Sequence, residues 1–305
     1  MRVRLLALFS AALLFLLGAV PAQAEGEGGN HDNGNGSYLA LGDSVPFGFN
    51  PLVNAKDEDN FVGYPEIVAE TLDLKDVNAT CPGEATGGFL SLTGTDNVCR
   101  PYRFVLKNPL HVRYSGTQMA FALSYLRHHH NTRLVTLTLG ANDFFHLQKV
   151  CAASYPDDPN AIAACVGAGI PALLATMSAN LNTILGTIRS TGYNGLIVGV
   201  TYYSLAYPDT SGADLLNGPM IGAAAAYGGL IASGVEAWRA TAMAAGGSSC
   251  TARLLILLPP GHVPPCDVHP TPLGRDLLAG AVIQTIAASC PEHDAQGCLD
   301  RDHND

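Results

Sequence analysis

Five short runs of apolar and β-branched residues recur along the chain at spacings that leave room for a helix between them. They cover residues 38–41, 74–79, 134–139, 196–203 and 253–258. Continuous apolar runs of this length are typical of strands buried on both faces. Helical segments are expected between and after them, over residues 64–72, 117–129, 171–190, 213–245 and 272–288. This alternation predicts an α/β fold, a three-layer α/β/α sandwich around a central, mostly parallel five-stranded sheet.

The first 24 residues have the pattern of a secretory signal peptide. Arg2 and Arg4 precede an apolar run over residues 5–20, and Pro21-Ala22-Gln23-Ala24 follows with the small-x-small form that signal peptidase cleaves. A membrane anchor is the alternative, but the run is short for a bilayer span. We expect a protein secreted after cleavage near Ala24, extracellular or periplasmic. No later stretch is uncharged and long enough to predict a stable membrane span.

The rest of the chain reads as one domain with polar ends. Residues 25–37 predict a flexible polar lead-in, residues 38–290 a single α/β domain, and residues 291–305 a polar, acidic tail. Residues 87–108 and 144–168 interrupt the strand and helix pattern, and we expect them to be long irregular insertions. Each would lie over or beside the edge of the sheet where the strands end.

Eight cysteines in an exported chain predict disulfides. A metal site is the rival interpretation, but the chain has no CxxC pair and no Cys/His cluster with zinc-ligand spacing. Sequence order suggests local pairs, although it does not prove the connectivity. The pairs would be Cys81 with Cys99, Cys151 with Cys165, Cys250 with Cys266, and Cys290 with Cys298.

Charge and histidine content exclude further classes of function. The formal net charge is −10 and no basic stripe is visible, which argues against binding to nucleic acid. His128, His129 and His130 are consecutive, so on a helix they point to different faces and do not share one ion. We expect a monomer with neither metal nor cofactor, acting on a small-molecule ester or lipid.

A candidate nucleophile directly follows the first expected strand. Gly42-Asp43-Ser44 ends that strand and precedes Val45-Pro46-Phe47-Gly48, where proline and glycine favour a tight turn. Such a turn lifts the serine clear of the sheet. The alternative without catalysis is that Asp43 or Ser44 only caps a helix. A serine nucleophile needs a base to remove its proton and donors to hold the oxyanion.

Asp267-Val268-His269 supplies the base. Two residues apart on an extended segment, the carboxylate and the imidazole leave the backbone on the same side, so Asp267 can fix the tautomer of His269 through Nδ1. The Nε2 atom is then free to take the proton from Ser44. Capping of the helix expected from residue 272 would explain one of the two side chains, but not both together with a matching serine.

Three donors are expected for the oxyanion. They are the backbone N–H groups of Ser44 and Gly83 and the side-chain amide of Asn142. Gly83 lies just after the second expected strand and Asn142 just after the third. The carboxyl ends of parallel strands share one edge of the sheet, so these groups are expected to meet Ser44 there. Gly87 and Gly88 are nearby alternatives to Gly83.

These segments together resemble the four sequence blocks of the SGNH hydrolases, also called GDSL-type esterases and lipases. The matches are Gly42-Asp43-Ser44, Gly83, Gly140-Ala141-Asn142-Asp143 and Asp267-Val268-His269, in the family's order. Val45 stands where the family's nickname has leucine. Cys81-Pro82-Gly83-Glu84 is similar to the exported, disulfide-bearing members. The resemblance implies a flavodoxin-like fold, a serine nucleophile with a His base and an Asp orienter, and no metal.

The sequence therefore predicts an exported serine ester hydrolase, an esterase or lipase that forms an acyl-enzyme on Ser44. A carbohydrate acetylesterase or a phospholipase on the same machinery is an alternative that differs only in the pocket. An extracellular binding module without catalysis is a third, but such a module has no physical need for these polar groups at one edge.

Overall fold

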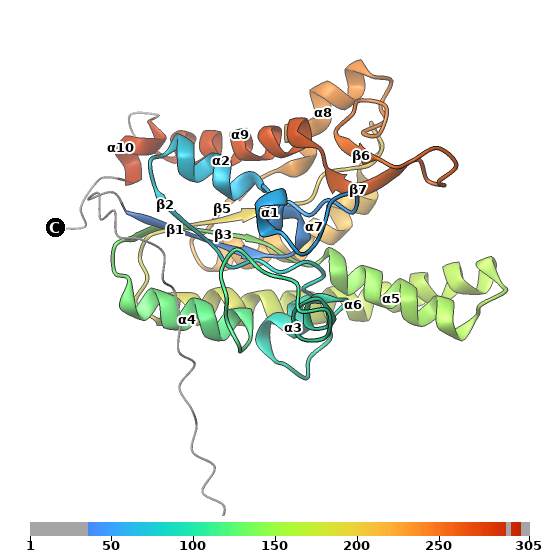
Figure 1. Cartoon of the computed structure of the whole chain (residues 1–305), viewed down its shortest axis with the longest axis horizontal. Helices are drawn as coiled ribbons and strands as arrows, with labels where there is room; N and C mark the ends of the chain where they lie inside the picture. The colour runs from blue at the N-terminus through green and yellow to red at the C-terminus, as the bar shows by residue number, and fades with distance from the viewer. Residues whose placement is uncertain (1–35, 291–293, 300–305) are drawn as a thin grey trace, which may run out of the picture.

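The computed structural model describes residues 36–290 and 294–299, so the expected signal peptide lies outside the described residues. Five parallel strands form the central sheet in the order β2-β1-β3-β4-β5. Helices cover both of its faces, which confirms the predicted three-layer sandwich (Figure 1). The strands of the sheet are β1 Ser37–Gly42, β2 Lys75–Asn78, β3 Thr132–Thr138, β4 Leu196–Val200 and β5 Leu230–Ala232.

Alternating side chains of the strands build two hydrophobic clusters, one on each face. Tyr38 of β1 points to a cluster with helices α2 (Tyr64–Thr71), α8 (Gly234–Ala244) and α9 (Pro272–Ser289). Its neighbour Leu39 points to the cluster on the other face. The helices on that side are α4 (Gln118–His128), α6 (Pro159–Ser190) and α7 (Ser211–Ala226). Burial on both faces explains why β1 and β4 read as continuous apolar runs.

The fifth strand of the sheet is not the one that the sequence predicts. β5 lies inside the segment 213–245, which we expected to be a single helix and which the structure divides into α7, β5 and α8. The expected strand 253–258 is instead β6 (Leu255–Leu257). It pairs antiparallel with β7 (Cys266–Pro270) in a separate hairpin. Both segments are short and apolar, and only the packing of the whole chain decides which of them joins the sheet.

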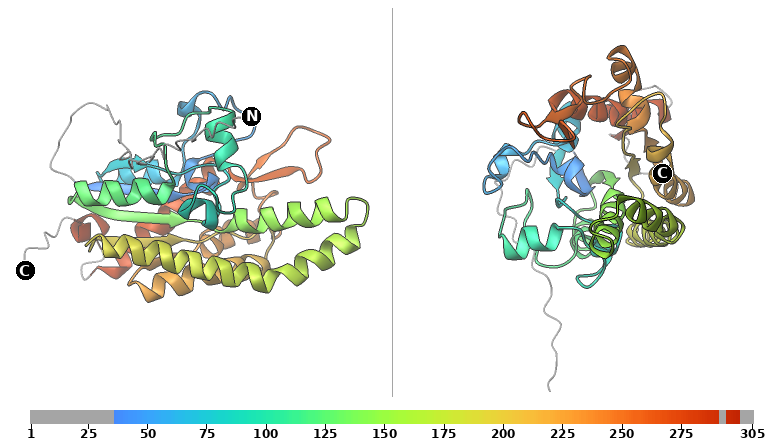
Figure 2. Two further views of the ribbon diagram at one scale, coloured as in Figure 1. Left: turned by 90° about the horizontal axis from the view of Figure 1, so that it is seen from below. Right: turned by 90° about the vertical axis from the view of Figure 1, so that its right-hand side faces the viewer.

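The second expected insertion is also different. Residues 144–168 are almost entirely helical: α5 runs over Ala141–Ser154, and α6 begins at Pro159, well before the expected start at Pro171. Pro171 lies inside α6, so it does not mark a helix boundary. α5 and the first part of α6 form a helical arm that extends beyond the carboxyl ends of the strands (Figures 1 and 2). We refer to residues 147–173 as the arm.

The remaining elements are short. The first expected insertion, 87–108, is irregular apart from single helical turns. Residues 291–305 were expected to be a solvated tail, but Ala295 and Leu299 of the last helix are buried against the cluster around α9. These elements are α1 Ser44–Phe47, η1 Glu58–Asn60, α3 Thr86–Leu90, η2 Pro101–Val105 and α10 Ala295–Leu299.

Three disulfides connect the expected partners: Cys81 with Cys99, Cys151 with Cys165, and Cys250 with Cys266. Cys290 is also disulfide-bonded. The side chain of Cys298, its expected partner, lies outside what the structure describes.

Among the described residues, α6 is one helix that is long and apolar enough to cross a membrane, judged by length and composition. The sequence analysis did not single out this stretch, but one helix of this kind does not indicate a stable membrane span. Its second half carries Leu181, Ile184 and Leu185, which are fully buried in the cluster with α4. That half is a core helix of the domain.

Candidate active site

The serine predicted as nucleophile lies in a sharp turn at the end of β1. Gly42 has φ +134°, and a Cβ atom at this position would approach the carbonyl oxygen of Thr138 to 2.0 Å, so only glycine fits. Asp43 caps the helical turn α1, because its Oδ1 atom accepts the N–H of Val45 at 3.0 Å. Ser44 is the first residue of that turn. The expected Asp cap and the expected nucleophile are thus adjacent features of one turn.

The structure brings Ser44, His269 and Asp267 together in a continuous chain of hydrogen bonds. The Ser44 Oγ atom is 2.8 Å from Nε2 of His269. The Nδ1 atom of His269 is bonded to Oδ1 of Asp267, which also accepts the His269 backbone N–H at 3.0 Å. Partial burial tends to raise the pKa of Asp267, but the hydrogen bond and charge of His269 outweigh it and lower that pKa below its ordinary value. The carboxylate therefore stays ionised beside the imidazole.

Three contacts fix β7, the strand that carries Asp267 and His269. The disulfide between Cys250 and Cys266 ends next to Asp267. The hydroxyl of Tyr203 donates to the carbonyl of Val268 at 2.6 Å. The ring of Tyr203 stacks on Trp238, with 3.6 Å between the ring centroids. Since Trp238 is fully buried, this stack joins β7 to the core.

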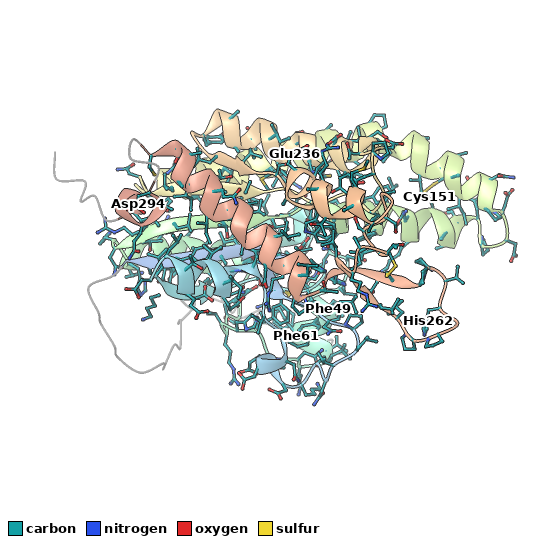
Figure 3. All side chains as sticks on the ribbon, turned by 90° about the horizontal axis from the view of Figure 1, so that it is seen from above. Phe49, Phe61, Cys151, Glu236, His262 and Asp294 are labelled. Atoms are coloured by element: carbon teal, nitrogen blue, oxygen red, sulfur yellow. A yellow bond between two sulfur atoms is a disulfide. The ribbon has the colours of Figure 1, made fainter. Side chains whose placement is uncertain are left out.

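Phe49 covers the imidazole from the other side. Its ring meets that of His269 edge to face at 5.0 Å and stacks on Phe61 at 5.8 Å. Figure 3 shows Phe49 and Phe61 side by side near the start of α9. These two rings form an apolar wall beside the imidazole of His269.

The predicted donors lie on three neighbouring loops. Within the part of the chain that the structure describes, the backbone N–H groups of Ser44 and Gly83 have no acceptor. Gly83 has φ +81°, and a Cβ atom there would lie 2.0 Å from the side chain of Val98. The Asn142 amide donates to Oδ2 of Asp43 at 3.3 Å with its Nδ2 atom, which has a second hydrogen to offer.

Asn97, which the sequence analysis missed, links two of these donor loops. Its backbone N–H donates to the carbonyl of Gly83 at 3.2 Å, and its side-chain amide donates to Oδ1 of Asn142 at 2.8 Å. The Oδ1 atom of Asn97 in turn accepts from the ammonium of Lys149 at 2.6 Å. With its oxygen held by Asn97, the Asn142 side chain must turn its NH₂ group toward Asp43 and the nucleophile.

Asp43 accepts hydrogen bonds from several of the groups around the candidate site. It is only 1 % exposed, and its Oδ2 atom also accepts the hydroxyl of Tyr202 at 2.6 Å. Burial raises the pKa of Asp43 to about 6, even though the hydrogen bonds from Tyr202 and Val45 oppose the rise. The carboxylate thus holds the nucleophile turn and Asn142 in place. Tyr202 is a further residue that the sequence analysis did not identify as a positioning group.

The loop after β2 is fixed by buried polar groups. Asp143 accepts the backbone N–H of Thr86 at 2.9 Å and its hydroxyl at 2.6 Å, which joins the third sequence block to the second. Gln118 bonds both the N–H and the carbonyl of Gly42 and donates to Glu84 at 3.3 Å. Burial, and secondarily the charge of Asp96, raise the pKa of Glu84 to about 8.

Cys81, Glu84 and Cys99 cluster closely enough to suggest metal ligands. Both sulfur atoms are consumed in the Cys81–Cys99 disulfide, so this group does not fit a metal. His128 and His129 lie exposed at the end of α4 and bond the carbonyls of its last turn, as a polar helix end would.

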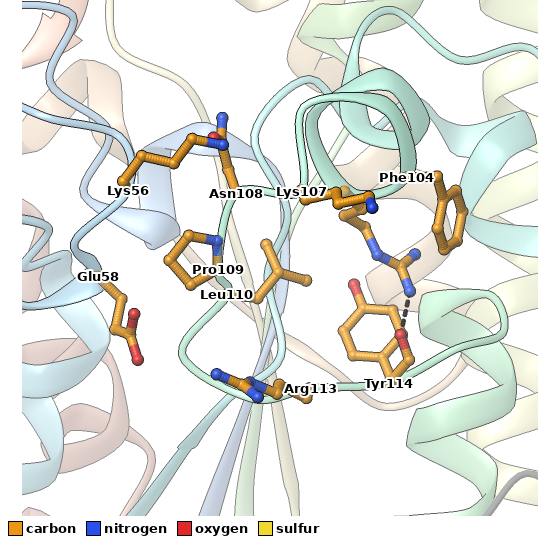
Figure 4. A pocket seen from close by; sticks show the side chains of 10 residues that line it. Lys56, Glu58, Phe104, Lys107, Asn108, Pro109, Leu110, Arg113 and Tyr114 are labelled. Carbon is orange, nitrogen blue, oxygen red and sulfur yellow. Dashed lines mark hydrogen bonds between the residues drawn. The ribbon is translucent and has the colours of Figure 1, made fainter.

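A cavity of about 470 Å³ lies beside the first insertion (Figure 4). Its walls include the cations Lys56, Lys107 and Arg113 and the apolar side chains of Phe104 and Leu110. None of the three residues in the Ser44 chain lines it, so it is separate from the candidate site.

The strand order β2-β1-β3-β4-β5, with helices on both faces of the sheet, is that of a flavodoxin-like three-layer α/β/α fold. Solved structures share this fold. A phospholipase A1 from Streptomyces albidoflavus NA297 has 17 % sequence identity and a TM-score of 0.51, over 82 % of this chain and 99 % of that chain. An extracellular lipase from Streptomyces rimosus has 19 % identity and a TM-score of 0.51, over 81 % and 99 %.

No protein-family model matches the chain, and no curated protein matches it by sequence. The resemblance that the short motifs indicate is therefore confirmed at the level of the fold.

Proposed function

We propose that this protein is an exported hydrolase of carboxylic esters that acts through an acyl-enzyme on Ser44. The observation that carries the proposal is the hydrogen-bonded chain from Ser44 through His269 to Asp267. This order is the one that converts a serine hydroxyl into a nucleophile.

His269 takes the Ser44 proton on Nε2 as the oxygen attacks the ester carbonyl. Asp267 keeps Nδ1 protonated and stabilises the imidazolium. The oxyanion is held by the N–H groups of Ser44 and Gly83 and by the amide of Asn142. His269 then gives its proton to the departing alkoxide, the ester C–O bond breaks, and the alcohol leaves. Water, activated by the same imidazole, attacks the acyl-enzyme and releases the acid.

The proposed substrate is a lipid or simple carboxylic ester. The apolar wall of Phe49 beside the imidazole suits an acyl chain better than a sugar. Two proteins of similar fold, the phospholipase A1 and the extracellular lipase, agree with this choice. Three disulfides agree with export, since such bonds persist outside the cytosol.

Hydrolysis of a chromogenic ester series from acetate to palmitate tests the proposal. Ser44→Ala should lower turnover of every cleaved ester by roughly six orders of magnitude while its circular dichroism and melting temperature stay close to those of the wild type. Near-normal turnover by Ser44→Ala would reject the mechanism. The preferred chain length separates an esterase from a lipase.

A further inference from the structure

Large apolar side chains are exposed on the same edge of the molecule as the candidate site. Leu52, Val150 and Leu205 are about half exposed, and each lies in a connection that leaves the carboxyl end of a sheet strand. In the β6–β7 hairpin, Leu257 is 66 % exposed and Val263 is 96 % exposed.

The opposite edge differs. Among the described residues, the connections 129–131, 191–195 and 227–229 at that edge carry no exposed large apolar side chain. Exposed apolar surface on a folded protein is costly unless something covers it, and Val263 at the active-site edge is the most exposed large apolar side chain among the described residues.

Two projections carry this surface outward. One is the arm; the other is the loop 258–265 between β6 and β7. Both extend from the same end of the molecule in Figures 1 and 2, and Figure 3 shows Cys151 of the arm and His262 of the loop at that end. The loop continues directly into β7, which carries Asp267 and His269, and α5 starts at Ala141, next to Asn142. The two projections are thus extensions of the two segments that supply catalytic groups.

The arm has an unusual charge pattern. The chain has no charged residue from Pro159 to Ile188, although the first half of α6 is mostly accessible to water. A solvent-facing helix normally has a charged outer face. Lys149 and the acidic pair Asp157 and Asp158 are the charges of the arm, and the acidic pair lies at its tip.

We propose that the protein docks on a lipid surface by its active-site edge, with the loop tip at Val263 and the flank of the arm as the contacting parts. The inference rests on the proposed function, which supplies the reason for bringing this edge to lipid. The proposed partner is neutral, zwitterionic lipid. The formal net charge of −10 and the acidic tip of the arm repel anionic headgroups. The choline cations of zwitterionic headgroups attract the acidic tip instead. Apolar side chains at the level of the headgroups then provide the binding energy.

Vesicle co-sedimentation of the inactive Ser44→Ala protein measures docking without hydrolysis. We expect binding to phosphatidylcholine vesicles and weaker binding to phosphatidylglycerol vesicles. Adding Val263→Asp or Val150→Asp should weaken binding to phosphatidylcholine about tenfold each, because a charged aspartate cannot enter the lipid surface as the exposed valine does. Ile221→Asp is the matched control. Ile221 is as exposed as Val150 but lies ten residues into α7, about 15 Å along the helix from that edge, and should change nothing.

The same variants with Ser44 intact separate docking from chemistry. Val263→Asp should hydrolyse a soluble acetate ester at the wild-type rate and a vesicle-bound ester about tenfold more slowly. Unchanged vesicle binding by both valine variants, equal weakening by Ile221→Asp, or preference for anionic vesicles would overturn the docking proposal. A dimer in light scattering that Val263→Asp dissociates would also overturn it, because the surface would then join two copies. If no ester is cleaved by the wild type, the proposed function fails, while the vesicle series still decides on docking.

Discussion

Replacement of Asn97 by alanine tests whether this residue positions the side-chain amide of Asn142, the proposed oxyanion donor. The side chain of Asn97 donates to Oδ1 of Asn142 at 2.8 Å, and Asn142 is 5 % exposed. Asn97→Ala removes this donor and keeps the backbone bond to Gly83. The oxygen of Asn142 then loses its partner, and its amide is free to rotate away from the oxyanion.

The size of the effect is bounded on both sides. Removal of an oxyanion donor costs about 10²–10³ in kcat, so a residue that acts through Asn142 cannot cost more. Loss of a single hydrogen bond to a buried acceptor costs about 1–2 kcal/mol, which corresponds to a fall of about 5–30-fold in rate. We expect Asn97→Ala to lower kcat by about 5–30-fold and to leave KM nearly unchanged, because the oxyanion forms only in the transition state.

Steady-state kinetics on a chromogenic acetate ester provide the assay. Asn97→Asp should be more damaging than alanine, about 100-fold, because the new carboxylate repels Oδ1 of Asn142 and turns the amide over. Lys149→Met is the matched control, since it removes only the bond on the far side of Asn97, and it should stay within about twofold of the wild type. Wild-type kcat in Asn97→Ala, or a change confined to KM, would refute the positioning role.

Three other variants test the supports of the site. Tyr203→Phe removes the 2.6 Å bond to the carbonyl of Val268 and should lower kcat about tenfold; an unchanged kcat would mean that the catalytic strand is held without it. Burial raises the pKa of Glu84 to about 8 from an ordinary value of 4.5, so the folded state keeps a proton that the unfolded state loses, and the free energy of unfolding falls as pH rises through that window. Glu84→Gln should therefore be more stable than the wild type at pH 9, on the order of 5 kcal/mol, and similar to it at pH 4; denaturation curves with the same difference at both pH values would contradict this. The double variant Cys250→Ser, Cys266→Ser should lose about 3 kcal/mol of stability in urea, and a loss below about 1 kcal/mol would show that the cross-link does not support the hairpin.

Where local patterns coincide with tertiary structure, the sequence predicts the fold well. β1, β3 and β4 are buried almost throughout and read as largely apolar runs, whereas β2 has the polar sequence Lys75–Asn78 and is buried only at its end. β5 has only three residues and lies between α7 and α8 in an Ala-rich segment. The apolar residues of this segment make the end of α7 and the start of α8 difficult to recognise in the sequence. Pro171 misled the prediction of α6 because a proline inside a long helix looks like a helix start. Contacts between distant parts of the chain decide where these elements begin and end, and a local sequence pattern does not show those contacts.

The same distinction holds for the candidate site. Ser44, Asp267 and His269 were predictable because each lies in a short motif whose chemistry depends on neighbours one or two residues away. Asn97 and Tyr202 had no such signal. Their partners are 45 and 159 residues distant in the chain, so only the folded structure shows that they position Asn142 and Asp43.

The central claim is that Ser44 is a nucleophile activated by His269. Labelling with an alkyl fluorophosphonate, followed by peptide mass spectrometry, tests it directly, because the reagent forms a bond only with an activated serine. The account predicts one stoichiometric adduct on Ser44 in the wild type and its near-complete loss in His269→Ala under the same conditions. An unlabelled Ser44, an adduct on a different serine, or equal labelling of Ser44 in both proteins would contradict it.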